Sequence, residues 1–288
     1  MKGKKIGFIG TGVMGASIVK HLLDAEYDVT IYTRTKEKAE ALVQLGAVWA
    51  ATPAEASKGK DIIFTMVGYP TDVEQVYFGD NGIFQSVNRG AVLVDMTTSD
   101  PTLAKRIYDH ASSMKVDALD APVSGGDIGA RNGTLSIMVG GDSEVFDNIK
   151  PVLEVFGENL VYQGKAGAGQ HTKMCNQITI AGTMIGVCES LVYGLNAGLD
   201  LDQVLKSISS GAAGSWSLSN LAPRMIKGDD APGFYIKHFV KDMKIALAEA
   251  ERMNLTLPGL QLVKEIYEKL IEAGYSENGT QALIKYYE

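Results

Sequence analysis

Short apolar runs alternate with segments of helical apolar spacing from about residue 4 to residue 162. The runs are rich in Val, Ile, Leu and Phe, as is typical of strands buried on both faces of a parallel sheet. They cover residues 6–10, 28–32, 62–67, 91–95, 118–121, 135–139 and 160–162. This alternation predicts an α/β domain with a doubly wound, mostly parallel sheet between two layers of helices.

The pattern changes after residue 162. A Gly/Ala-rich joint, GKAGAG at 164–169, is followed by apolar periodicity that is helical only. Helices are expected at 170–197, 201–209, 215–226, 236–253, 258–273 and 281–287. The sequence therefore predicts an α/β domain over 1–164 and an all-α domain over 165–288, with a small-molecule site in the cleft between them.

A glycine-rich turn joins the first apolar run to a helical pattern. Gly10 would allow the tight turn, Gly12 the approach of a pyrophosphate, and Gly15 close packing of the helix on the strand. The diphosphate would lie on the unsatisfied N–H groups of that helix. The turn thus predicts a Rossmann-like dinucleotide site; an empty glycine turn is the alternative. Its residues are Gly10, Thr11, Gly12, Val13, Met14 and Gly15.

The residues after the second apolar run bear on whether NAD(H) or NADP(H) is preferred. It continues as Thr33-Arg34-Thr35, without the carboxylate that holds the ribose 2′-hydroxyl in NAD-binding folds. Arg34 can stack on adenine and pair with a 2′-phosphate. We therefore expect NADP(H) to be preferred over NAD(H). The alternative, a solvated basic start to a surface helix, leaves the preference open.

Two later strand ends can also line the cofactor. The backbone of Val67 is expected along the adenosine or ribose path, and Thr98 on the nicotinamide side. The alternative for this second loop is a simple helix cap, because Ser99 or Asp100 precedes Pro101.

A polar turn follows the fifth run. The Ser124 hydroxyl and the backbone N–H groups of Gly125 and Gly126 can form a small anion nest. A substrate carboxylate would fit there, and a flexible loop is the alternative.

Lys173 and Asn176 lie three positions apart and so share one helix face. A lysine can exchange the proton that accompanies hydride transfer if its pKa is lowered; a solvated surface ammonium is the alternative. His171 competes as a general base, but it projects away from the Lys173 direction. Lys241 can reach the nicotinamide end, or form an exposed ion pair with Asp242 of little energetic value.

Composition narrows the classes of partner. The 288 residues carry a net charge of −7, which argues against nucleic acid. Cys175 and Cys188 show neither metal-ligand spacing nor a disulfide framework, so no metal is expected. We see no run of about 18 apolar residues and no apolar signal core, so we expect a cytoplasmic protein without membrane contact.

Four segments match one family in its order and spacing: FIGTGVMG, DAPVSGG, GAGQHTKMCNQ and FVKDM. The chain resembles the β-hydroxyacid dehydrogenases, which include 3-hydroxyisobutyrate dehydrogenases, tartronate semialdehyde reductases and short glyoxylate/succinic semialdehyde reductases. The resemblance covers essentially the whole chain. It implies a Rossmann-like domain followed by a helical domain, a long interdomain helix, and homodimers or homotetramers built through the helical part.

The resemblance also implies residue roles. Lys173 matches the catalytic lysine and Asn176 the substrate-orienting amide. The carboxylate-binding turn is matched by Ser124, Gly125 and Gly126, the nicotinamide contacts by Thr98 and Lys241, and the NADP(H)-using members by Thr33, Arg34 and Thr35. The expected pocket segment, residues 211–216, mixes a Gly-Ser typical of the tartronate group with a tryptophan typical of the 3-hydroxyisobutyrate group.

The expected activity is NADP(H)-dependent hydride transfer to or from a small 3-hydroxy acid or semialdehyde that bears a carboxylate. A glyoxylate/succinic semialdehyde reductase is the alternative within the family. The chain is short for a 6-phosphogluconate dehydrogenase, and Lys173 argues against an imine reductase. A nucleotide-binding sensor without turnover is the alternative outside enzymes.

Overall fold

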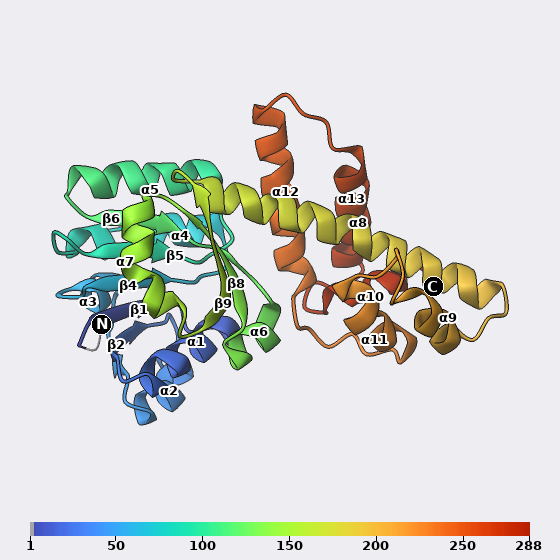
Figure 1. Cartoon of the computed structure of the whole chain (residues 1–288), viewed down its shortest axis with the longest axis horizontal. Coiled ribbons are helices and arrows are strands. Elements are labelled where there is room, and N and C mark those ends of the chain that lie inside the picture. The colour runs from blue at the N-terminus through green and yellow to red at the C-terminus, as the bar shows by residue number, and fades with distance from the viewer. Residues whose placement is uncertain (1–2) are drawn as a thin grey trace. The chain divides into compact units, whose positions relative to one another are not determined.

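The computed structural model describes residues 3–288 and divides into two compact units, Met1–Lys173 and Met174–Glu288. The long helix α8 (Ala168–Asn196) runs from the first unit into the second (Figure 1). The first unit is an α/β domain and the second is all-helical, as the hydrophobic pattern predicts. The domain border after residue 164 stays a prediction.

The first unit is built on one sheet. Its strands are β1 (Lys5–Ile9), β2 (Asp28–Tyr32), β3 (Val48–Trp49), β4 (Ile62–Thr65), β5 (Val92–Asp95), β6 (Asp117–Asp120), β7 (Val123–Ser124), β8 (Leu135–Gly140) and β9 (Gly157–Gly164). They are ordered β3-β2-β1-β4-β5-β6-β8-β7, with β9 beside β8. Pairing is parallel from β3 to β6, whereas β8 runs antiparallel to β6 and β7.

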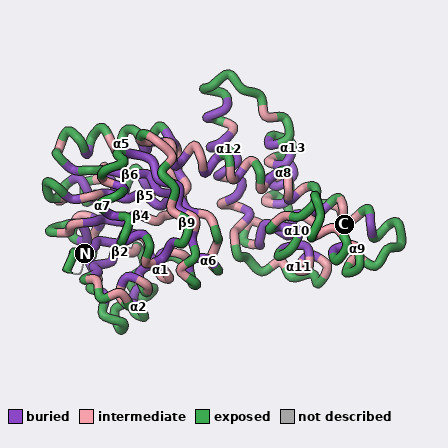
Figure 2. Tube along the Cα trace, in the orientation of Figure 1, coloured by how far each residue is buried: buried purple, intermediate pink, exposed green. Residues whose placement is uncertain are grey.

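Helices cover both faces of this sheet (Figure 1). They are α1 (Val13–Asp24), η1 (Lys36–Ala39), α2 (Glu40–Gln44), α3 (Pro53–Ser57), α4 (Pro70–Phe78), η2 (Ile83–Gln85), α5 (Pro101–Ser113), α6 (Gly126–Asn132) and α7 (Ser143–Leu153). Phe8 and Phe64 share a core with α1 and α7, whereas their neighbours Ile9 and Ile63 share another with α4 and α5. Strand side chains alternate between faces, so every second residue enters a different core; Figure 2 shows these strands buried.

The strand order reverses direction at β1. The chain passes from β1 to β2 and β3 on one side, then returns to β4 on the other side of β1. In doubly wound sheets, ligands bind beyond the carboxyl ends of the strands at such a switch point. The glycine turn at residues 10–15 lies there, directly after β1.

The second unit continues from α8 with five α-helices and one 3₁₀-helix. They are α9 (Leu201–Ile208), α10 (Trp216–Asn220), α11 (Ala222–Ile226), α12 (Ile236–Arg252), α13 (Pro258–Glu272) and η3 (Thr280–Tyr287). One helix was expected over 215–226, but α10 and α11 separate at Leu221. Pro223 has no N–H to continue the hydrogen-bond ladder, so the chain restarts there.

Among residues 3–288, α8 alone is long and apolar enough to cross a membrane by length and composition, although no such segment was expected. Its apolar side chains have another partner. Those buried in the core of the helical unit are Met174, Ala181, Met184, Val187, Cys188 and Leu191. Core packing therefore accounts for much of the apolar character of this helix.

Candidate active site

The glycine turn after β1 has the shape of a phosphate cradle. Gly10 has φ +99°, and a Cβ there would lie 2.1 Å from the Met66 carbonyl oxygen. A Cβ on Gly15 would lie 2.1 Å from the Gly10 carbonyl oxygen. Both positions therefore require glycine for the fold itself.

Gly12 differs, because a Cβ there would meet no atom within 4 Å. It is the N-cap of α1 and has no side chain to cap the first N–H groups of that helix. The helix start therefore offers donors and open space together, which is what a bound phosphate needs.

Thr11 gives a second sign that a polar group belongs in this turn. The residue is 5% exposed, and its Oγ1 has no hydrogen-bond partner among the residues described. A buried hydroxyl without a partner is uncommon and costly. A dinucleotide therefore fits the turn on two independent grounds, the open cradle at Gly12 and the unsatisfied Thr11 hydroxyl.

The end of β2 presents basic and hydroxyl side chains. The Arg34 side chain is 79% exposed, and its Nη1 donates to Oδ1 of Asp72 at 3.2 Å. Asp72 also accepts from the Tyr69 backbone N–H at the start of α4. The carboxylate thus holds Arg34 from one side and leaves most of its guanidinium accessible.

The loop after β5 is tied to the loop after β4. The Val67 N–H donates to Oγ1 of Thr97 at 3.0 Å, and the Thr97 N–H donates to Oδ1 of Asp95 at 3.1 Å. Asp100, of the two cap candidates, accepts from the Thr102 N–H at 2.7 Å and caps α5. The cap and the predicted contact of Thr98 therefore fall on different residues of this loop.

The turn from β7 into α6 has the expected backbone. Gly125 and Gly126 have φ +127° and +62°, and Gly125 caps α6 without a side chain. Ser124 is half-buried at the end of β7. The nearest acidic group along this helix, Asp127, is paired with Arg131 at 2.7 Å, which offsets its repulsion of an incoming anion.

Lys173 lies in the first turns of α8 and is 7% exposed. The alternative of a solvated surface ammonium is therefore wrong for this residue. Lysine is seldom buried to this extent unless it has partners or a task. A buried amine is a group whose protonation depends on its surroundings, which makes Lys173 a candidate for proton transfer.

A polar chain links α8 to α12 within the helical unit. Asn176 Nδ2 donates to Oε1 of Gln177 at 2.6 Å, and Gln177 Nε2 donates to Oδ2 of Asp242 at 2.6 Å. Lys241 Nζ lies 3.0 Å from Oδ1 of Asp242, with the two side chains 12% and 2% exposed. The exposed ion pair that is the alternative for Lys241 is therefore wrong, because Asp242 is buried and the Lys241 side chain is largely covered.

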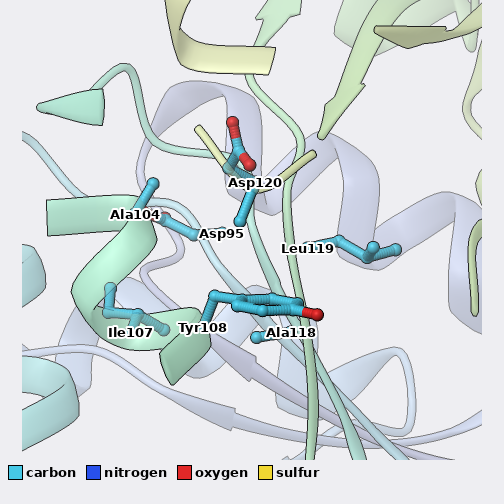
Figure 3. Close-up of a pocket in the computed structure, with 8 residues that line it drawn as sticks. Asp95, Ala104, Ile107, Tyr108, Ala118, Leu119 and Asp120 are labelled. Carbon is cyan, nitrogen blue, oxygen red and sulfur yellow. The ribbon is translucent and has the colours of Figure 1, made fainter. Parts of the chain in front are cut away.

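A small cavity lies under the buried carboxyl of Asp120, at the end of β6 (Figure 3). Its volume is about 10 Å³, room for about one water molecule. Burial raises the pKa of Asp120, while backbone N–H groups of Gly167, Gln170 and Gly169 act in the opposite direction. This carboxyl supports the start of α8 and is absent from the sequence-based site; a buried aspartate ending a strand was its only signal.

No cluster of three or more His, Cys, Asp or Glu side chains suited to a metal ion occurs within residues 3–288. The first unit combines a glycine turn with space for a phosphate, a second glycine turn after β7 and the buried amine of Lys173. Together with the doubly wound sheet and the helical unit, these features define an NAD(P)-binding oxidoreductase of the Rossmann-like class.

Comparison with known proteins gives the family. Residues 5–164 match the NAD binding domain of 6-phosphogluconate dehydrogenase, and residues 167–287 match the domain described as NAD-binding of NADP-dependent 3-hydroxyisobutyrate dehydrogenase. The chain belongs to the β-hydroxyacid dehydrogenases, oxidoreductases that act on CH–OH donors. The resemblance of the four motifs is thereby confirmed.

Relatives span the whole chain. A probable 3-hydroxyisobutyrate dehydrogenase-like protein of Arabidopsis thaliana is 47% identical, over 97% of this chain and 84% of its own. The 2-hydroxy-3-oxopropionate reductase of Escherichia coli is 39% identical, over 98% and 96%. A solved 3-hydroxyisobutyrate dehydrogenase of Mycobacterium tuberculosis, with L-serine, superposes with a TM-score of 0.90 at 27% identity and covers 99% of both chains.

Proposed function

We propose that this protein transfers a hydride between NADP(H) and a small 3-hydroxy acid or its semialdehyde, with Lys173 as the proton donor and acceptor. The burial of Lys173, at 7% exposure on the first turns of α8, is the observation that carries the proposal. A surface lysine would keep its proton in water, whereas a buried amine can release it near the working pH.

The substrate carboxylate binds at the turn after β7. The positive φ values of Gly125 and Gly126 support this role, because they give a turn that glycine adopts readily and that has no side chains to cover its backbone N–H groups. Ser124 adds its hydroxyl. A carboxylate can accept from all three donors, which orients the short substrate by its charged end.

The reacting oxygen is held by Lys173 and Asn176. They share a face of α8, and the hydrogen bond of Asn176 to Gln177 limits the rotation of its amide. When bound, the nicotinamide supplies the hydride to the aldehyde carbon. Lys173 then gives its proton to the carbonyl oxygen, and in the opposite direction it takes the proton from the hydroxyl group.

The nucleotide is held by residues 10–15, with Val67, Thr98 and Lys241 along its length, and NADP(H) is preferred over NAD(H). Support for the preference comes from the end of β2, where Thr33, Arg34 and Thr35 offer donors and no carboxylate. Arg34 is suited to a 2′-phosphate because its guanidinium is mostly exposed and steadied by Asp72.

The test is NADPH oxidation with tartronate semialdehyde, methylmalonate semialdehyde, succinate semialdehyde and glyoxylate. We expect turnover of at least one, and a loss of about 10²- to 10⁴-fold in Lys173→Ala. The control is Lys165→Ala, an exposed lysine just before α8, for which wild-type rates are expected.

NADPH binding, followed by its fluorescence, separates chemistry from folding. Lys173→Ala should still bind NADPH. Tight binding without turnover of any aldehyde by the wild type would refute the substrate class and favour a sensor; equal rates in Lys173→Ala and the wild type would refute the role of the lysine.

A further inference from the structure

Gln170, in the first turn of α8, is a fully buried amide with two side-chain hydrogen bonds to the loop after β5. Its Oε1 accepts from the Ser99 N–H at 2.9 Å, and its Nε2 donates to the Thr97 carbonyl oxygen at 2.7 Å. A backbone N–H can meet only the oxygen of the amide, and a carbonyl only its nitrogen. The partners therefore fix which way the Gln170 amide points.

These two hydrogen bonds lie on either side of Thr98 along the backbone. One goes to the peptide before Thr98 and the other to the peptide after it, so the side-chain amide pairs with the loop as a neighbouring strand residue would. Thr97 and Ser99 are 2% and 1% exposed, so water cannot readily replace these bonds. The backbone of Thr98 is thus held on both sides by one residue of α8.

The start of α8 is itself fixed to the sheet. The carboxylate of Asp120 accepts from the N–H groups of Gly167 and Gln170 at 2.7 and 2.8 Å. A Cβ on Gly169 would lie 2.6 Å from the Asp120 carbonyl oxygen, so the helix backbone lies directly against the end of β6. The helix cannot shift along this edge without breaking those bonds.

We propose that Gln170 is a positioning residue that sets the nicotinamide-side loop at Thr98 in register with the proton-transfer amine of Lys173. Lys173 is three residues further along α8 and so lies on the same face. The proposal rests on the proposed function. A displacement of about 1 Å between reacting groups can cost about 100-fold in rate, so a rigid link between loop and helix matters for catalysis.

The test compares Gln170→Leu with Gln163→Leu. Gln163 is a matched control because its side chain also contacts α8, accepting from the Thr172 hydroxyl at 3.2 Å, without touching the loop. Hydride transfer is measured in a single turnover and expressed per bound NADPH. We expect a fall of about 100-fold for Gln170→Leu and less than twofold change for Gln163→Leu.

A purely structural role would reduce the amount of competent protein and leave the rate per bound NADPH unchanged, and that result would overturn the proposal. Backbone amide exchange at Ser99 gives a reading without turnover: it should accelerate in Gln170→Leu. If the wild type reduces no aldehyde, the proposed function fails. In that case the amide exchange rate of Ser99 alone tests whether Gln170 holds the loop. An unchanged rate in Gln170→Leu would overturn that role.

Gln170→Glu supplies a second test should the leucine variant not fold. Ionised, the glutamate places an acceptor against the Thr97 carbonyl; protonated, it restores both the donor and the acceptor. Its transfer rate relative to the wild type should therefore rise as pH falls through the pKa of the introduced carboxyl. A ratio that stays constant with pH would overturn the proposal.

Discussion

Replacing Gly12 by alanine should separate the stability of the first unit from its affinity for the nucleotide. Gly12 has φ −70° and ψ −167°, extended backbone that any residue adopts, and an added Cβ would meet no atom within 4 Å. Alanine reduces the conformational freedom of the unfolded chain, which stabilises by about 0.4–1 kcal/mol, but it is a poorer N-cap than glycine by a similar amount. The stability of the free protein should therefore change by less than about 1 kcal/mol.

The affinity for NADPH should fall in the same variant. The added methyl group occupies the space in front of the first N–H groups of α1, where we place the pyrophosphate. The loss of one hydrogen bond to a charged phosphate costs about 1.5–3 kcal/mol, which corresponds to a roughly 10- to 150-fold weaker affinity for NADPH.

Gly15→Ala is the matched comparison. Its Cβ would lie 2.1 Å from the Gly10 carbonyl oxygen and 3.1 Å from the Phe8 ring, so the fold should lose about 1–3 kcal/mol through overpacking. Calorimetry without nucleotide and fluorescence titration with NADPH measure the two effects. Wild-type NADPH affinity in Gly12→Ala would refute the placement of the pyrophosphate; destabilisation equal to that of Gly15→Ala would refute the geometry of the turn.

Two further predictions concern single side chains. Arg34→Ala should raise the KM for NADPH about 10- to 150-fold and leave that for NADH nearly unchanged, since one charged contact to the 2′-phosphate is lost; equal effects on both nucleotides would contradict the assignment. One thiol should react with a disulfide reagent at pH 8 in the native protein and two after denaturation, because Cys175 is exposed whereas burial, with Glu189, raises the pKa of Cys188 to about 12. Rapid labelling of both native thiols would show that the core around Cys188 opens.

Much of the candidate site consists of residues that are neighbours in the sequence, namely the glycine turn at residues 10–15, the basic end of β2 and the turn at 124–126. In the two turns, Gly10, Gly125 and Gly126 have the positive φ that glycine permits. The motif predicts Lys173 as the catalytic lysine, whereas its burial depends on tertiary packing. The sequence did not point to the hydrogen bonds of Gln170 and Asp120, because the groups that they bond lie 71 and 50 residues away.

The sequence by itself determined the alternation of strands and helices, the change to an all-helical second part and the place of the nucleotide turn. Those features depend on side-chain periodicity and glycine conformation over a few residues. Only the tertiary structure decided the antiparallel direction of β8, the largely covered Lys241–Asp242 pair and the hold of Gln170 on Thr98. The physical reason is that these hydrogen bonds and this burial depend on contacts between segments far apart in the sequence. The hydrophobic pattern within one segment does not specify such contacts.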